Sequence, residues 1–111
     1  MRLLTDELKA KLISNNVEAR EADHIPVVKL FTPWAAATWI LTEMEPDGVC
    51  FGLCDLGHGT PELGYVSVEE LELLTGPHGL RVKRDLHFRT DKPLSVWTEA
   101  ARRAREIVVP K

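Results

Sequence analysis

The tetrapeptide Glu45-Pro46-Asp47-Gly48 constrains the fold most, because it separates two stretches of β-forming residues. Proline presets φ early in a turn, and glycine accepts a positive φ at its end. Both flanking stretches, Thr38–Met44 and residues 49–54, are short and rich in β-branched, aromatic and other apolar residues. The sequence therefore predicts a β-hairpin.

The length of this turn predicts the register of the hairpin. A four-residue turn places these pairs on one face: Met44 with Val49, Thr42 with Phe51, and Ile40 with Leu53. On the opposite face it places Trp39 across from Cys54 and Leu41 across from Gly52. Large side chains there meet small ones, so we expect a helix to pack closely on that face, with both cysteines serving as small packing groups.

Local signals predict the remaining elements. We expect a helix capped by Thr5 that ends near Asn15 and Asn16, and a two-turn helix opened by the capping box Ser67-Val68-Glu69-Glu70. A last helix follows Pro93, with Ser95 as its cap. Further strands are predicted over residues 27–32, 64–67 and 81–88.

This order of elements lacks the alternation of a doubly wound parallel sheet and predicts an α+β fold. We expect a four- to five-stranded, mainly antiparallel sheet packed by N-terminal and C-terminal helices, both on one face. The 111 residues fit a single domain, residues 1–111, and contain 44% hydrophobic and 28% charged residues, which is typical of a globular protein. We also expect no export signal and no contact with a membrane, since long apolar runs are missing. Two cysteines are too few for a secreted disulfide framework, which favours the cytoplasm.

The charge is distributed unevenly along the chain. Residues 1–48 contain 5 basic and 8 acidic side chains, residues 49–80 contain 0 and 5, and residues 81–111 contain 9 and 4. The basic C-terminal third either contacts nucleic acid, through Arg102, Arg103 and Arg105, or lies beside the acidic middle third and neutralises it. We favour neutralisation, because nucleic-acid-binding domains are usually basic overall.

A glycine-rich segment, residues 51–64, concentrates the reactive side chains. It contains Asp55 and Glu62, and loops that leave a strand often present functional groups. With Asp85 and His87, which would lie about 7 Å apart on one face of a strand, these residues form a candidate acid–base or ligand site. The alternative is structural: Asp55 caps a tight turn, and Asp85 pairs with a neighbouring arginine. We favour the structural alternative.

Cys50, Cys54 and His58 are spaced four residues apart, which suggests a zinc site, but the geometry of a strand argues against it. On a strand the two cysteines would be about 13 Å apart, too far for one metal ion or for a disulfide. We therefore expect no metal and no cofactor. The carboxylates of Asp55 and Glu62 would raise the pKa of Cys54, so we expect an unreactive thiol.

No motif of the common enzyme classes occurs in the chain, which favours a non-enzymatic protein over an enzyme and leaves both open. Trp34, beside Pro33, is a candidate anchor for a protein partner. Three hypotheses follow: a protein-interaction module, a small enzyme or ligand-binding domain, and a nucleic-acid contact.

Several segments together resemble one bacterial family. These are residues 26–33, 37–43, 51–57, 61–64 and 84–88, of which Pro26-Val27-Val28-Lys29-Leu30-Phe31-Thr32-Pro33 is the longest. They resemble the domain of unknown function 2958 family over nearly the whole chain. The resemblance implies an accessory role, because members often occur on plasmids and other mobile elements. It assigns no catalytic or binding residue.

Overall fold

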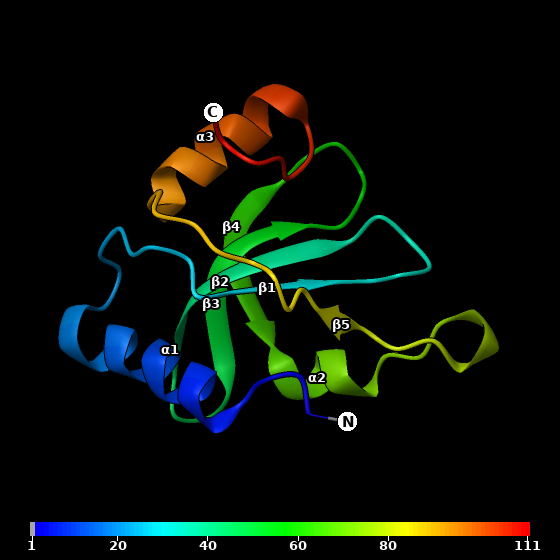
Figure 1. Ribbon diagram of the computed structural model, residues 1–111, viewed down its shortest axis with the longest axis horizontal. Helices are drawn as coiled ribbons and strands as arrows, with labels where there is room; N and C mark the ends of the chain where they lie inside the picture. Colours follow the sequence, from blue (N-terminus) through cyan, green and yellow to red (C-terminus); the bar gives the residue numbers. More distant parts are fainter. Residues whose placement is uncertain (1) are drawn as a thin grey trace.

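A computed structural model describes residues 2–111, which form an antiparallel sheet between helices (Figure 1). The sheet has the strand order β4-β3-β2-β1-β5. Its strands are β1 (Val28–Phe31), β2 (Thr38–Met44), β3 (Val49–Asp55), β4 (Glu62–Ser67) and β5 (Lys83–Arg84). The helices are α1 (Asp6–Ala19), α2 (Val68–Leu73) and α3 (Leu94–Ala104), with a short 3-10 turn, η1 (Pro77–Gly79), before β5. The α+β prediction is confirmed.

The helices cover both faces of the sheet, so the prediction that the terminal helices share one face is wrong. In Figure 1, α1 and α2 lie on one side of the sheet and α3 on the other. Leu12 of α1 and Leu71 of α2 join one buried cluster, which we call the α1-side core. Trp97 and Ala101 of α3 join a second cluster with Ile40 and Leu53, which we call the α3-side core. Since residues alternate between the faces of a strand, β2 and β3 supply both cores.

The β2–β3 hairpin forms as predicted, but its register is right only in part. Ile40 pairs with Leu53, Trp39 with Cys54, and Leu41 with Gly52, as expected. Toward the turn the register shifts by one residue, so that the pairs are Glu43 with Phe51 and Met44 with Cys50.

A β-bulge at Thr42 causes this shift. The extra residue lets Met44 reach the α1-side core. It also lets the buried carboxylate of Glu43 accept hydrogen bonds from the Asn16 side chain and the Glu21 backbone. These contacts come from residues far from the turn. The sequence of the turn alone therefore could not determine the register.

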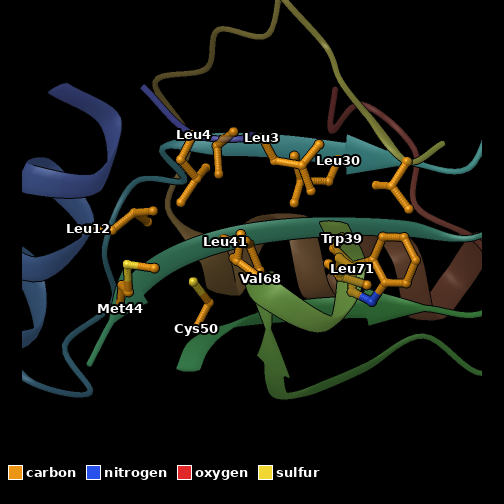
Figure 2. Packing of buried hydrophobic residues seen from close by; sticks show 12 residues of the cluster. Leu3, Leu4, Leu12, Leu30, Trp39, Leu41, Met44, Cys50, Val68 and Leu71 are labelled. Atoms are coloured by element: carbon orange, nitrogen blue, oxygen red, sulfur yellow. The ribbon is translucent and has the colours of Figure 1, made fainter. Parts of the chain in front are cut away.

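The cysteines and Gly52 pack as the hairpin predicts. Cys50 is fully buried in the α1-side core beside Met44 and Leu41 (Figure 2), and Cys54 is partly buried against the same core. A Cβ atom on Gly52 would lie 2.0 Å from the carbonyl oxygen of Ile40. Only glycine therefore fits this position on β3.

The ends of several elements differ from the predictions. The caps Thr5 and Ser67 accept the expected backbone hydrogen bonds, but α1 continues past Asn15, whose side chain donates to the Thr42 carbonyl. Ser95 lies inside α3 and donates to the Asp23 carboxylate instead of capping the helix. The strand expected over residues 81–88 shortens to β5. Strand β4 begins two residues earlier than expected, at Glu62.

Candidate functional site

The four acid–base candidates lie on opposite parts of the sheet. Asp55 ends β3 and Glu62 begins β4, whereas Asp85 and His87 follow β5. Strand β5 lies four strand spacings from β4, which carries Glu62, and three from β3, which carries Asp55. At about 4.8 Å per spacing these separations are about 19 Å and about 14 Å, too far for shared acid–base chemistry. The structure brings together Asp85 and His87 but not the set of four.

Asp55 has a structural role in the fold. Its carboxylate is buried, and its two oxygens accept hydrogen bonds from the backbone N–H groups of Gly57, at 2.9 Å, and Ile107, at 3.1 Å. The first bond closes the turn after β3, and the second holds the segment after α3. Glu62 is exposed on β4.

Asp85 ends the β5 edge. Its Oδ1 accepts the backbone N–H of His87 at 2.9 Å, which bends the chain out of the sheet. Among residues 2–111 it forms no ion pair with the neighbouring arginines, and the Arg84 guanidinium donates instead to the Leu3 carbonyl. Asp85, half-buried, and His87, exposed, line a hollow of about 580 Å³ together with residues of β1 and of the β1–β2 loop.

The cysteines carry the properties of buried thiols. Both are free, and burial raises the pKa of Cys50 to about 12 and also raises the pKa of Cys54. The direction expected for Cys54 is confirmed, but its cause is burial and not the two carboxylates. Among residues 2–111, no group of three or more His, Cys, Asp or Glu side chains is placed to hold a metal ion.

Trp34 lies half-buried in the β1–β2 connection and packs against the α1-side core. Its indole covers Gly76, where an added Cβ atom would lie 2.2 Å from the ring. Much of the ring that was expected to anchor a partner is therefore in contact with the protein's own chain.

The three arginines near the C-terminus are exposed. Arg102 and Arg103 lie in the last turn of α3, where Arg103 pairs with Glu99, and Arg105 follows with a left-handed backbone that ends the helix. Within the described residues no ion pair joins the acidic segment 49–80 to the basic segment 81–111. The basic third does contact the acidic one through Arg81, which donates to the backbone carbonyls of Glu72 and Leu73.

The sequence analysis predicted the strand β4 but missed that it is an edge strand with exposed apolar side chains. Leu63 and Tyr65 pair with Leu53 and Phe51 of β3 and are 43% and 55% exposed. Because the strand was expected only from Gly64, Leu63 was not recognised as part of an alternating pattern with Tyr65. The signal that could have indicated an edge strand was Pro61, directly before β4, since proline in sheets is confined mainly to edge strands and strand starts.

Comparison with known proteins assigns the chain to a family. The family described as protein of unknown function (DUF2958) matches residues 3–108, and the chain belongs to it. This confirms the resemblance drawn from the sequence. No curated protein and no solved structure matches the chain. Among the helices within residues 2–111, none has the length and apolar character needed to cross a bilayer.

Proposed function

We propose that this member of the DUF2958 family is a protein-interaction module that receives an extended segment of another protein along β4. The observation that carries the proposal is the free outer edge of β4, six residues long, with Leu63 and Tyr65 exposed. An added strand gains backbone hydrogen bonds from such an edge, and the alternating side chains provide specificity.

Strand β4 lacks the features that usually protect an edge. Lysine, internal proline, bulges or short length normally prevent an edge from pairing with another chain. Residues 62–67 contain no lysine, arginine or proline, and their register with β3 is continuous from Glu62 to Ser67. Among the described residues, the backbone hydrogen bonds outside helices and strands include none from this strand.

The two faces of β4 define the chemistry of the partner. On the α3 side, Leu63 and Tyr65 favour apolar or aromatic residues at alternate positions of the added strand. On the opposite side lies Glu62, and the exposed Glu69 and Glu70 of α2 follow β4 directly. Since residues 49–80 contain no lysine or arginine, the intervening positions of the partner should be basic.

A second copy of the chain fits this edge less well. Pairing β4 with β4 would place the carboxylates of two copies beside one another, and like charges across an interface are unfavourable. The basic β5 of another copy has only two residues, too few to match β4. The proposed occupant is therefore a different protein that contributes an extended segment of alternating apolar and basic residues.

The place of this module in the cell is part of the same proposal. We propose a bacterial, cytoplasmic, non-enzymatic accessory protein of plasmids or other mobile elements, as the family resemblance implies. The cysteine count supports the cytoplasm, because two cysteines are too few for a secreted disulfide framework.

A synthetic peptide tests the edge directly. The probe is an eight-residue peptide that alternates valine and lysine, and the control peptide alternates valine and glutamate. Fluorescence anisotropy should show binding of the first peptide only. The double variant Leu63→Lys/Tyr65→Lys should weaken this binding at least 10-fold, because it places gatekeeper charges on β4.

The matched control is the double variant Leu86→Lys/Val109→Lys, which adds the same charge at two residues outside β4 that are 74% and 75% exposed. It should change peptide affinity less than twofold. Equal weakening by both variants would show that net charge and not β4 governs binding. Equal binding of both peptides would contradict the basic character proposed for the partner. Dimerisation of the wild-type protein alone, lost in the double variant, would replace the proposed partner with a second copy.

A further inference from the structure

The sheet face beneath α3 is covered only in part. Helix α3 packs on β3 and β4 and leaves the β1 end of the same face open. There lies the hollow of about 580 Å³, within the range of small-molecule sites. Its floor is the sheet surface at Lys29, Phe31 and Thr38.

Phe31 is an aromatic side chain without a place in either core. Val28 and Leu30 fill the α1-side core, so Lys29 and Phe31 alternate onto the opposite face. Phe31 is half-buried and belongs neither to the α1-side core nor to the α3-side core. A ring in this position offers a stacking surface.

The walls of the hollow keep this ring accessible. One wall is the β1–β2 loop, whose residues Ala35, Ala36 and Ala37 have the smallest side chains that retain a Cβ atom. The other wall is the segment from Arg84 to His87, which the Asp85 turn directs away from the sheet. Filling either wall with larger side chains would close the hollow.

Two charged side chains that line the hollow, Lys29 and Asp85, can form further ionic or hydrogen-bonding contacts. Lys29 is half-buried and forms no ion pair within residues 2–111. Asp85 uses Oδ1 for the His87 N–H, and no hydrogen bond to Oδ2 occurs among the described residues. The hollow therefore offers a cation for an oxyanion and a carboxylate oxygen for an N–H donor.

We propose that this hollow binds a small ligand that combines a planar ring with an oxyanion, the chemistry of a nucleoside monophosphate. The ring stacks on Phe31, an N–H group of the ring donates to Asp85, and the oxyanion binds Lys29. This site is independent of β4, because it lies at the other end of the sheet.

The test is titration of isotope-labelled protein with adenosine monophosphate, adenosine, phenyl phosphate and inorganic phosphate, followed by NMR. Adenosine monophosphate should shift the amide signals of residues 35–38 and bind at least 10-fold more tightly than adenosine or inorganic phosphate. Lys29→Met should weaken its binding at least 10-fold and leave adenosine binding within twofold. Lys11→Met, at an exposed lysine of α1 on the opposite face of the sheet, is the matched control and should have no effect.

A second variant separates the ring from the charge. Phe31→Leu should weaken both adenosine monophosphate and adenosine, whereas Phe31→Trp should retain them, which excludes a mere loss of folding. Phenyl phosphate binding as tightly as the nucleotide would support the ring-and-oxyanion chemistry and assign it to an aromatic acid. Absence of shifts at residues 35–38, or inorganic phosphate binding equally well, would overturn the proposal.

Discussion

The two edges of the sheet differ in length and in charge. Strand β5 has two residues, Lys83 and Arg84, and the side chain of Asp85 ends it in a turn. Strand β4 has six residues, pairs regularly with β3 and exposes Leu63 and Tyr65. Short, charged edges avoid pairing with other chains, whereas long apolar edges invite it. The contrast favours β4 over β5 as the edge for the proposed partner.

The strongest way to break this comparison is to detach β4 and β3 from the rest of the sheet. Gly52→Ala would place a Cβ atom 2.0 Å from the Ile40 carbonyl oxygen, and backbone cannot move aside as a side chain can. We expect a loss of about 3 kcal/mol in the free energy of unfolding, at the upper end of overpacking effects. Chemical denaturation followed by circular dichroism measures it.

Gly64→Ala is the matched control, because Gly64 pairs with Gly52 and an added Cβ there meets nothing within 4 Å. It should change stability by no more than about 0.5 kcal/mol. Equal losses in both variants would mean that glycine matters here for backbone freedom in general and not for the close approach of β2 to β3.

A smaller effect comes from the thiol buried beneath the β4 half of the sheet. Cys50, opposite Val66 of β4, has a pKa raised to about 12 by burial, whereas the thiol ordinarily titrates near 9.0. The folded state keeps the proton that the unfolded state loses, so this stabilisation is fully present well below pH 9 and falls as the pH rises toward 12. At pH 9.5 the loss is about 1 kcal/mol.

Denaturation at pH 7.5 and pH 9.5 tests this, with Cys50→Ala compared to wild type. The variant is less stable at both pH values because it leaves a cavity, but its loss between them should be about 1 kcal/mol smaller. Hydrogen exchange should place the alkaline loosening in β3 and β4 rather than in β1 and β5. An identical pH dependence in the two proteins would assign the effect to other groups.

Local signals explain what the sequence could predict. The caps Thr5 and Ser67 act within four residues, and both form as expected. The chain also reverses at Pro46–Gly48 as expected, but Met44 pairs with Cys50 and not with Val49. The bulge at Thr42 could not be predicted, because it depends on Asn16 and Glu21 binding Glu43 across the fold. The alternating pattern of residues 81–88 predicts one strand over the whole segment. It cannot show that Asp85 accepts the His87 N–H and ends the strand there.

The candidate sites were less predictable than the fold, since each depends on what stays uncovered. The sequence placed Asp85 and His87 near one another, and both line the hollow. It did not show that β4 and β5 are opposite edges of the sheet, nor that α3 packs on β3 and β4 and leaves the β1 end open. Whether an edge or a face of the sheet stays exposed depends on how all the elements pack, so no pattern of neighbouring residues in the sequence predicts it.

The smallest expected effect tests whether the short length or the positive charge of β5 prevents another chain from pairing with it. Lys83→Val removes the exposed lysine from this edge and should change stability by no more than about 0.5 kcal/mol. If length is decisive, the variant still binds no peptide at β5, because two residues followed by the Asp85 turn cannot support an added strand. Anisotropy in the Leu63→Lys/Tyr65→Lys background, where β4 is blocked, measures this without interference. A gain of binding to the valine–glutamate or valine–lysine peptide there would show that charge alone had kept β5 unpaired, and that the two edges differ in degree rather than in kind.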